Sequence, residues 1–250
     1  MRQLTPYKNP DQAPEAEKVP VVVVKRIREA ILDEVFKPGD RLTEAELVEK
    51  FEVSRSPVRE ALLALEKEGT IVISPFRGAT VKLLSPEEVQ DIAELRFALI
   101  TLAAKPAHRH LSPADLDLLS GLANQITAAN SAKEHFECNR HFWDILFEKA
   151  QRPILWEVFT QLDDRMTRYY PLFLKLFPTP ASRPRQQEVL VEIYRKGNID
   201  EAVRAFKKIY LGVVDQFTDH LNTRDRRPFM LKRPSKKSSR KMAYEKRGNH

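Results

Sequence analysis

The feature that most constrains the fold of this chain is the stretch 54–69, which has the pattern of a helix with a well-marked start. Pro57 has φ near the helical value and no N–H to lose, so it suits a first helical turn, and Ser56 is the expected N-cap. Arg55 and Arg59, four residues apart, then point outward at the helix entrance. The expected buried stripe has the i, i+3, i+4, i+7 spacing and consists of Val58, Ala61, Leu62 and Leu65.

Two outward guanidinium groups at a helix N-terminus favour an interaction with DNA. The first turn of a recognition helix reaches base edges and phosphates, and its unpaired N–H groups attract anions. A solvated helix start with two surface arginines explains these residues equally well. The flanking segments are needed to decide between the two interpretations.

The segments before this helix complete a helix-turn-helix. Thr43 as N-cap and Glu46 three residues later form a capping box that opens a short helix. Residues 20–36 form another helix, which Pro38-Gly39 ends. Its expected buried positions are Val23, Ile27, Ala30, Ile31 and Val35. Two short helices joined by a tight turn, with a third helix covering their apolar faces, form this motif.

The segment after the helix predicts a β wing. Residues 70–74 and 79–83 have the composition of strands, and the turn 75–78 separates them. Arg77 and Gly78 lie at the tip of this hairpin. We therefore expect a winged helix-turn-helix, which favours DNA binding over a solvated helix.

Three blocks of this region, residues 37–44, 53–62 and 77–81, follow one another in a specific order. In this order they resemble the GntR-type bacterial transcriptional regulators. The resemblance places Arg55, Ser56 and Arg59 where the family reads operator bases and phosphates. It places Arg77 and Gly78 where the wing of the family enters the minor groove.

Glu52 departs from the pattern of the family, which often has glycine at this turn. If this backbone position has positive φ, a glutamate costs on the order of 1 kcal/mol there, and the turn is slightly reshaped.

The net charge of +7 is unevenly distributed. Residues 224–250 hold eleven Lys or Arg and only two Asp or Glu, so the rest of the chain is slightly acidic. This tail has no periodic apolar pattern and is predicted to be disordered, either as a solvated end or as an extra attraction to DNA phosphates. No apolar run is long enough to span a bilayer, and the lone Cys138 fits a reducing cytoplasm. We expect a cytoplasmic protein without a membrane partner.

The chain after the wing has the pattern of an antiparallel all-α bundle. Ser85 as N-cap and Pro86 at the next position open its first helix, whose expected stripe is Ile92, Leu95, Leu99, Leu102 and Ala103. The fold class is therefore mainly α, an N-terminal winged helix-turn-helix with a small β wing followed by the bundle. The expected divisions are a flexible N-terminus (1–18), the DNA-binding domain (19–84), the helical effector-binding and dimerisation domain (85–222) and the basic tail (223–250).

Residues 91–98, 139–155 and 196–202 make this second half resemble the FCD-type effector domain of the FadR-like branch of the same family. Many such domains hold a divalent metal with acidic or asparagine and histidine side chains. The resemblance places Asn139, Trp143, Gln187 and Ile209 at these positions. Because an indole and an aliphatic chain offer no lone pair to a metal, we expect neither a metal nor another cofactor.

The resemblance places Arg96 near the same pocket, where it is the natural counter-charge for an anionic effector. The expected effector-binding residues are thus Arg96, Asn139, Trp143 and Gln187. The alternative is that the Trp143 side chain simply fills this pocket and leaves no room for an effector.

These observations predict a ligand-responsive transcriptional regulator with repression as the favoured mode. It would bind a palindromic operator as a homodimer and be released by a small organic acid, most plainly a carboxylate, or by an acyl compound. A regulator whose bundle only dimerises stays open as an alternative. An enzyme is disfavoured, because we find no catalytic constellation: the adjacent pairs Asp163-Asp164 and Tyr169-Tyr170 diverge around their helices.

Overall fold

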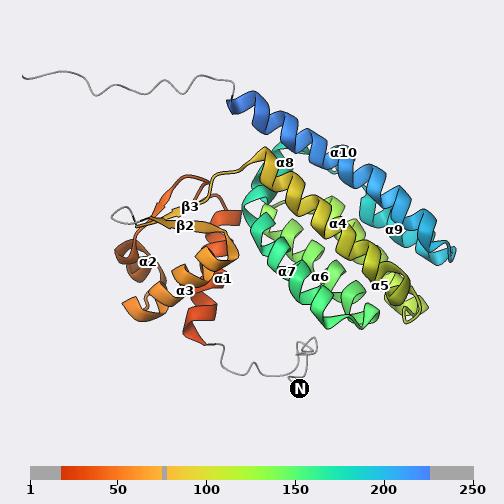
Figure 1. Cartoon of the computed structure of the whole chain (residues 1–250), viewed down its shortest axis with the longest axis horizontal. Coiled ribbons are helices and arrows are strands. Elements are labelled where there is room, and N and C mark those ends of the chain that lie inside the picture. The colour runs from red at the N-terminus through yellow and green to blue at the C-terminus, as the bar shows by residue number, and fades with distance from the viewer. Residues whose placement is uncertain (1–17, 75–77, 226–250) are drawn as a thin grey trace, which may run out of the picture.

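The computed structural model describes residues 18–74 and 78–225. Arg77, the predicted flexible N-terminus up to residue 17 and the predicted tail beyond residue 225 lie outside the described residues. A small unit of helices and strands lies beside a larger bundle of helices (Figure 1). This architecture confirms the predicted fold class of a mainly α chain with a small β wing.

The smaller unit is a winged helix-turn-helix. Its elements are α1 (Val19–Leu32), β1 (Arg41–Leu42), α2 (Glu44–Phe51), α3 (Arg55–Glu68), β2 (Ile71–Ser74) and β3 (Gly78–Val81). The strands form an antiparallel sheet in the order β1-β3-β2, with Ile71 paired with Val81. The predicted stripe of α3 is buried, and it packs on α1 and α2.

Two helix boundaries differ from the prediction. Helix α3 begins at Arg55 after Ser54, so Ser56 is not its N-cap. Pro57 still lies in the first turn, where a backbone N–H has no helical partner, and so it costs no hydrogen bond. Helix α1 ends at Leu32, well before the expected Phe36, because Glu34 has φ of 56° and turns the chain. The side chain of Val35 is 50% exposed instead of buried.

The two helices of the helix-turn-helix each end at a residue with positive φ. Glu52 ends α2 with φ of 55°, in the left-handed region where the family often has glycine. A glutamate there costs on the order of 1 kcal/mol relative to glycine. Gly69 ends α3 with φ of 78° and carries no such cost.

The larger unit is a bundle of helices. Its α-helices are α4 (Pro86–His108), α5 (Pro113–Ala128), α6 (Ala132–Ala150), α7 (Pro153–Met166), α8 (Tyr170–Leu176), α9 (Gln186–Arg195) and α10 (Ile199–Asp225), with short 3-10 turns at Thr167–Tyr169 and Pro180–Ser182. The predicted cap of α4 is confirmed, since Ser85 Oγ accepts from the Glu88 N–H at 3.2 Å. Within the ranges described, no helix is long and apolar enough to cross a membrane.

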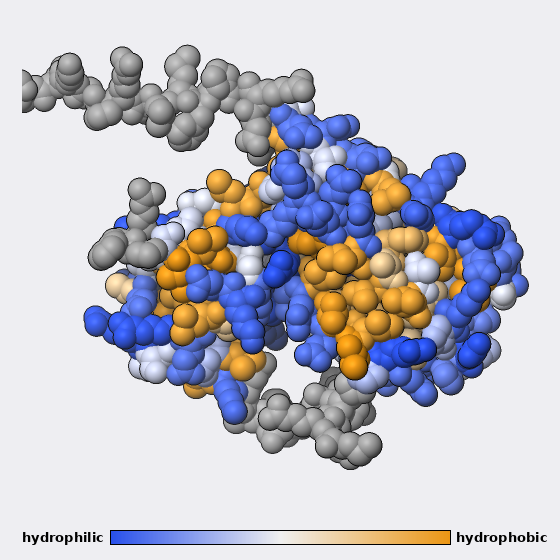
Figure 2. All heavy atoms as spheres, viewed as in Figure 1, coloured by the Kyte–Doolittle hydropathy of each residue, from blue (hydrophilic) through white to orange (hydrophobic). Residues whose placement is uncertain are grey.

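Helix α4 buries only part of the predicted stripe. Ile92 and Ala103 are buried as predicted and Leu99 packs against the core, but Leu95 and Leu102 are 55% and 59% exposed. Together with Ile154 and Val158 of α7, the two leucines belong to an apolar surface over α4 and α7 (Figure 2). We call these four side chains the α4/α7 face. These two leucines were wrongly predicted to be buried because α4 is apolar on more than one side, so the spacing of its apolar residues does not select a single buried face.

Candidate functional site

The predicted DNA-reading residues of α3 lie on its solvent-exposed side. Arg55, Ser56 and Arg59 are all exposed. Arg55 has no ion pair or hydrogen bond with any other residue that the structure describes. Arg59 also points outward, but it has a partner on α2, because its Nε donates to Glu44 Oε1 at 2.8 Å. This hydrogen bond and the carboxylate charge raise the pKa of Arg59.

A groove of about 380 Å³ separates α3 from the sheet, and it brings further charge to this surface. Arg41, Glu44, Arg59 and Gly78 are among its lining residues. Gly78 has φ of 75°, and a Cβ built on it would lie 3.7 Å from the Arg41 guanidinium. Arg41 was not predicted as a site residue. Its place in the first block, residues 37–44, was the one indication in the sequence. The pairing of β1 with β3 is what brings the exposed Arg41 next to the wing.

The predicted effector residues surround one cavity of the bundle. Arg96, Asn139, Trp143 and Gln187 all line it, and its volume is about 70 Å³. The position matched to Ile209 is not among the lining residues, and Tyr210 of the next position takes its place. Ligand pockets usually occupy ~300–1,000 Å³, so Trp143 and its neighbours leave room for little more than water.

Three side chains of this cavity bond to Asn139, while Gln186 Oε1 and Arg96 Nε are buried there without a hydrogen-bond partner among the described residues. Asn139 Nδ2 donates to the Tyr170 hydroxyl at 2.9 Å. Asn139 Oδ1 accepts from Trp143 Nε1 at 3.2 Å and from Gln187 Nε2 at 2.9 Å. Two neutral amides, a phenol and an indole do not fit a divalent metal, which prefers imidazole, thiolate or carboxylate ligands. Among the described residues, His135 is the only imidazole that lines the cavity, and one imidazole does not complete a ligand set.

His135 is buried in the wall of this cavity, and the sequence did not indicate its role. Its Nδ1 lies 3.1 Å from the Ile126 carbonyl oxygen, and its ring packs against Tyr170 and Phe173. Burial lowers the pKa of His135 to about 4, so the ring is neutral at pH 7.

Arg96 does not present a free charge to the cavity. Its Nη2 lies 2.7 Å from Asp163 Oδ1, and the two side chains are 6% and 0% exposed. Asp163 also accepts from Arg140 Nε at 2.9 Å. Burial disfavours the charged form of Arg96, but the attraction of Asp163 together with that of Tyr210 and Tyr170 more than offsets this effect, so the pKa of Arg96 is raised. An anionic ligand would therefore compete with Asp163 for this guanidinium.

The Arg96–Asp163 pair is the inner end of a continuous series of charges. Arg140 Nη2 donates to Asp164 Oδ1 at 2.5 Å. Arg28 Nη2 of α1 then lies 2.9 Å from Asp164 Oδ2 and 2.6 Å from Glu68 Oε1. Glu68 is the last residue of α3. The series, which we call the ion-pair chain, runs through Arg96, Asp163, Arg140, Asp164, Arg28 and Glu68 from the cavity to the end of the recognition helix.

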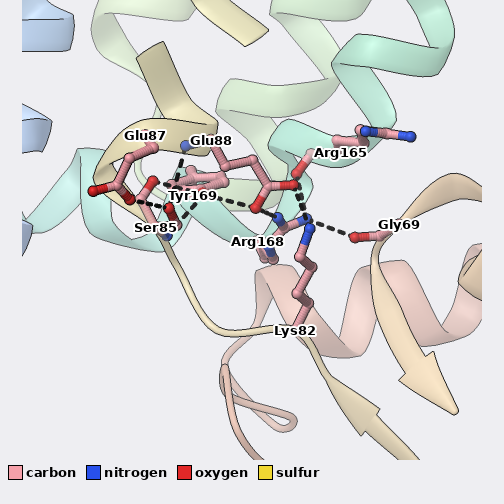
Figure 3. A network of polar contacts seen from close by, with 8 residues as sticks. All are labelled: Gly69, Lys82, Ser85, Glu87, Glu88, Arg165, Arg168 and Tyr169. Carbon is pink, nitrogen blue, oxygen red and sulfur yellow. Dashed lines mark hydrogen bonds and ion pairs between the residues drawn. The ribbon is translucent and has the colours of Figure 1, made fainter. Parts of the chain in front are cut away.

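A second polar network ties the same end of α3 to the bundle (Figure 3). Arg168 is almost fully buried, pairs with Glu88 at the start of α4 and donates through Nη1 to the Gly69 carbonyl at 3.1 Å. Lys82 approaches the other oxygen of Glu88 at 2.9 Å. The Tyr169 hydroxyl contacts both backbone polar groups of Ser85. The segment between the two units is thus held from both sides.

Two family models match this chain in succession. The model for the bacterial regulatory proteins of the gntR family matches residues 21–81, and the model for the FCD domain matches residues 91–211. The chain belongs to the GntR family. These two models describe the DNA-binding domain and the effector-binding domain of transcriptional regulators.

Two named transcriptional regulators of Escherichia coli are similar to this chain in sequence. The chain is 32% identical over 134 residues to the HTH-type transcriptional regulator McbR of Escherichia coli. The aligned part covers 52% of this chain and 61% of McbR, so it spans less than two thirds of that relative. It is 26% identical over 186 residues to the HTH-type transcriptional repressor RspR of Escherichia coli, covering 73% of this chain and 82% of RspR. The structure of E. coli McbR/YncC has the same fold, with a TM-score of 0.69 at 24% identity over 82% of this chain and 100% of that one.

Proposed function

We propose that this GntR-family regulator is a cytoplasmic repressor that binds a palindromic operator as a homodimer and leaves it when a small carboxylate enters the bundle. The observation that carries this proposal is the ion-pair chain, since it connects the cavity to the last residue of the recognition helix. The similarity to RspR, a transcriptional repressor, supports the repressive mode.

The DNA-binding surface consists of the exposed start of α3 and the wing. Arg55 and Arg59 would contact bases or phosphates in the major groove, together with Ser56. Gly78 and Arg77 would enter the adjacent minor groove. The phosphate backbone between the two grooves then lies between α3 and the wing. Arg41 is positively charged there and forms no ion pair with another described residue.

Dimerisation follows from the size of an operator and from an uncovered surface. One recognition helix reads about half of a typical operator, so two-fold symmetric pairs are the usual solution. The α4/α7 face gives such a pair an apolar contact, because Ile154 is 74% exposed and Leu102 is 59% exposed. We propose that a second copy of this chain covers it.

A carboxylate would act by exchange at Arg96. The ligand would take the guanidinium from Asp163, which keeps its bond to Arg140. That exchange changes the balance of charge along the ion-pair chain and so the docking of α3 on the bundle. A ligand shifts the protein only by its different affinity for the two arrangements, a few kcal/mol at most. The alternative, in which Trp143 permanently fills the hole and the bundle only dimerises, has the small cavity in its favour.

The proposal is tested first on DNA. The wild-type protein is used to select a binding site from a random duplex library. Arg55→Ala and Arg59→Ala should each weaken binding to that site by about 1–3 kcal/mol without changing the fold, because both side chains are exposed. Unchanged affinity of the folded double variant would rule out α3 as the reader.

The ligand is tested separately by thermal shift of chelator-treated protein against a panel of carboxylates and acyl thioesters. A hit that also releases the selected duplex supports the proposed exchange. A panel without hits favours the dimerisation-only alternative and leaves the DNA-binding result standing.

A further inference from the structure

Glu44 and Arg59 form an ion pair between the two helices of the helix-turn-helix. Arg59 Nε donates to Glu44 Oε1 at 2.8 Å, and the two side chains are 65% and 37% exposed. Both residues line the groove between α3 and the sheet. The guanidinium therefore has one fixed contact with protein and otherwise faces solvent on the side where DNA would lie.

The carboxylate is placed by a rigid piece of backbone. Glu44 is the first residue of α2, directly after Thr43, whose Oγ1 accepts from the Glu46 N–H at 3.2 Å. The next arginine toward the start of α3, Arg55, has no such partner among the described residues. The two arginines thus differ: Arg59 is held in one orientation and Arg55 is not.

The atom that Glu44 engages determines which donors remain for DNA. An arginine offers paired N–H groups at its end, through both Nη atoms, or along its side, through Nε and one Nη. With Nε bound to Glu44, the side edge is occupied and the end edge stays available. A bidentate contact with the O6 and N7 atoms of guanine requires such a pair in a fixed direction.

We propose that Glu44 is a positioning residue that makes Arg59 select its base, a role that rests on the proposed operator binding. Glu44 reduces the rotamer freedom that Arg59 must lose on binding, so it favours the correct sequence. Its negative charge also disfavours contact with phosphates, which every DNA sequence presents equally. Both effects increase the ratio between specific and non-specific affinity.

The alternative role is structural. An exposed ion pair usually adds little to stability, and a glutamate at a helix N-terminus also interacts favourably with the helix dipole. Glu46 is the matched control, because it is exposed in the same first turn of α2 and its side chain has no hydrogen bond or ion pair with the described residues of α3. A structural role would not change the ratio of affinities for two DNA sequences.

The experiment uses the full chain, the duplex selected by wild type and a scrambled duplex of equal length, with dissociation constants measured by fluorescence anisotropy. Glu44→Ala should reduce the affinity ratio roughly three- to tenfold. Glu44→Gln should restore part of it, because its amide oxygen still accepts from Arg59 Nε. In an Arg59→Ala background the effect of Glu44→Ala should disappear, and Glu46→Ala should leave the ratio unchanged.

Three results would overturn the inference. Equal effects of Glu44→Ala and Glu44→Gln would mean that only the charge matters. A loss that persists with Arg59→Ala would mean that Glu44 acts elsewhere. An unchanged ratio in Glu44→Ala, with wild type still selecting a site, would refute the positioning role alone, whereas a wild-type protein that selects no site would refute operator binding as well.

Discussion

Arg28 of α1 and Asp164 of α7 lie 2.9 Å apart and join the winged unit to the bundle through a partly buried ion pair. The same Nη2 atom of Arg28 also contacts Glu68 of α3. One guanidinium therefore links three helices from two units. The relative placement of the recognition helix depends on electrostatics as well as on apolar contact.

Removing this guanidinium should loosen the junction. We expect Arg28→Gln to reduce the free energy of unfolding by about 1–3 kcal/mol, since two carboxylates lose a partly buried partner. Arg185→Gln is the matched control, because Arg185 forms an exposed pair with Glu188 at 3.4 Å and should cost less than about 0.5 kcal/mol. Urea denaturation compares the two. Equal losses would show that Arg28 contributes only as a surface charge.

Arg96 should behave as a structural charge as well as a candidate ligand contact. Arg96→Met leaves the fully buried Asp163 with Arg140 alone, and we expect a loss of about 3 kcal/mol. In the Arg96→Met background, Asp163→Asn should reduce the free energy of unfolding much less than it does in the wild-type protein, because the two side chains form an ion pair. A double-mutant cycle from urea unfolding measures this coupling. Strictly additive losses would contradict the pairing.

The buried His135 and the half-buried Asp144 should give the stability opposite dependences on pH. The pKa of His135 is lowered to about 4 by burial, so between pH 4 and 6.5 only the unfolded chain binds that proton and stability rises with pH. The pKa of Asp144 is raised to about 6, mainly by burial. Between pH 4 and 6 the folded chain therefore binds the extra proton at Asp144, and stability falls as pH rises.

The two dependences separate when one group is removed. His135→Gln should make the unfolding free energy fall more with pH between 4 and 6, while Asp144→Asn should make it rise more. The full effect of His135 is on the order of 3 kcal/mol. Urea unfolding at several pH values measures the slopes. Parallel curves for wild type and both variants would mean that neither group is buried as described.

The α4/α7 face should control the oligomeric state. Leu102→Glu places a charge on a side chain that is already 59% exposed, so the fold should survive while the dimer dissociates. Leu63→Glu is the matched control, because Leu63 is 60% exposed but lines the groove beside the wing. Sedimentation at micromolar concentration distinguishes them. A wild-type protein that is monomeric at that concentration would contradict the proposed pairing.

Arg41 should contribute to DNA affinity without contributing to sequence preference. Arg41→Ala should weaken binding to the selected and the scrambled duplex equally and reduce the salt slope of binding by about one unit, as expected for one phosphate contact. Anisotropy titrations at several salt concentrations measure this slope. An unchanged slope would remove Arg41 from the interface.

Much of the fold was predictable because its signals are local. The cap at Thr43, the cap at Ser85 and the buried stripe from Val58 to Leu65 each depend on residues within two helical turns. The start of α3 was misplaced by two residues, since Ser54 and Ser56 are both suitable N-cap side chains near a proline. Such a choice depends on the turn before the helix, which Glu52 shapes.

The polar interior was not predictable, because it depends on contacts between distant segments. Asp163 looked like half of a divergent acidic pair, yet its partners come from α4 and α6. His135 likewise has no local pattern that distinguishes a buried ring from a surface one. The predicted cavity residues do gather in one place, but nothing in their spacing indicated that they bond to each other.

The bundle cavity has a volume of only about 70 Å³, so a ligand that enters beside Trp143 needs a wider arrangement of the site. Such a ligand binds only the fraction of molecules in which the site is open, so its apparent dissociation constant is the intrinsic one divided by that fraction. If opening costs about 2 kcal/mol, roughly one molecule in thirty is receptive and the apparent affinity falls about thirtyfold. The small cavity of about 70 Å³ would then raise the ligand concentration that is needed for binding. Below that concentration the ligand would leave the protein on DNA.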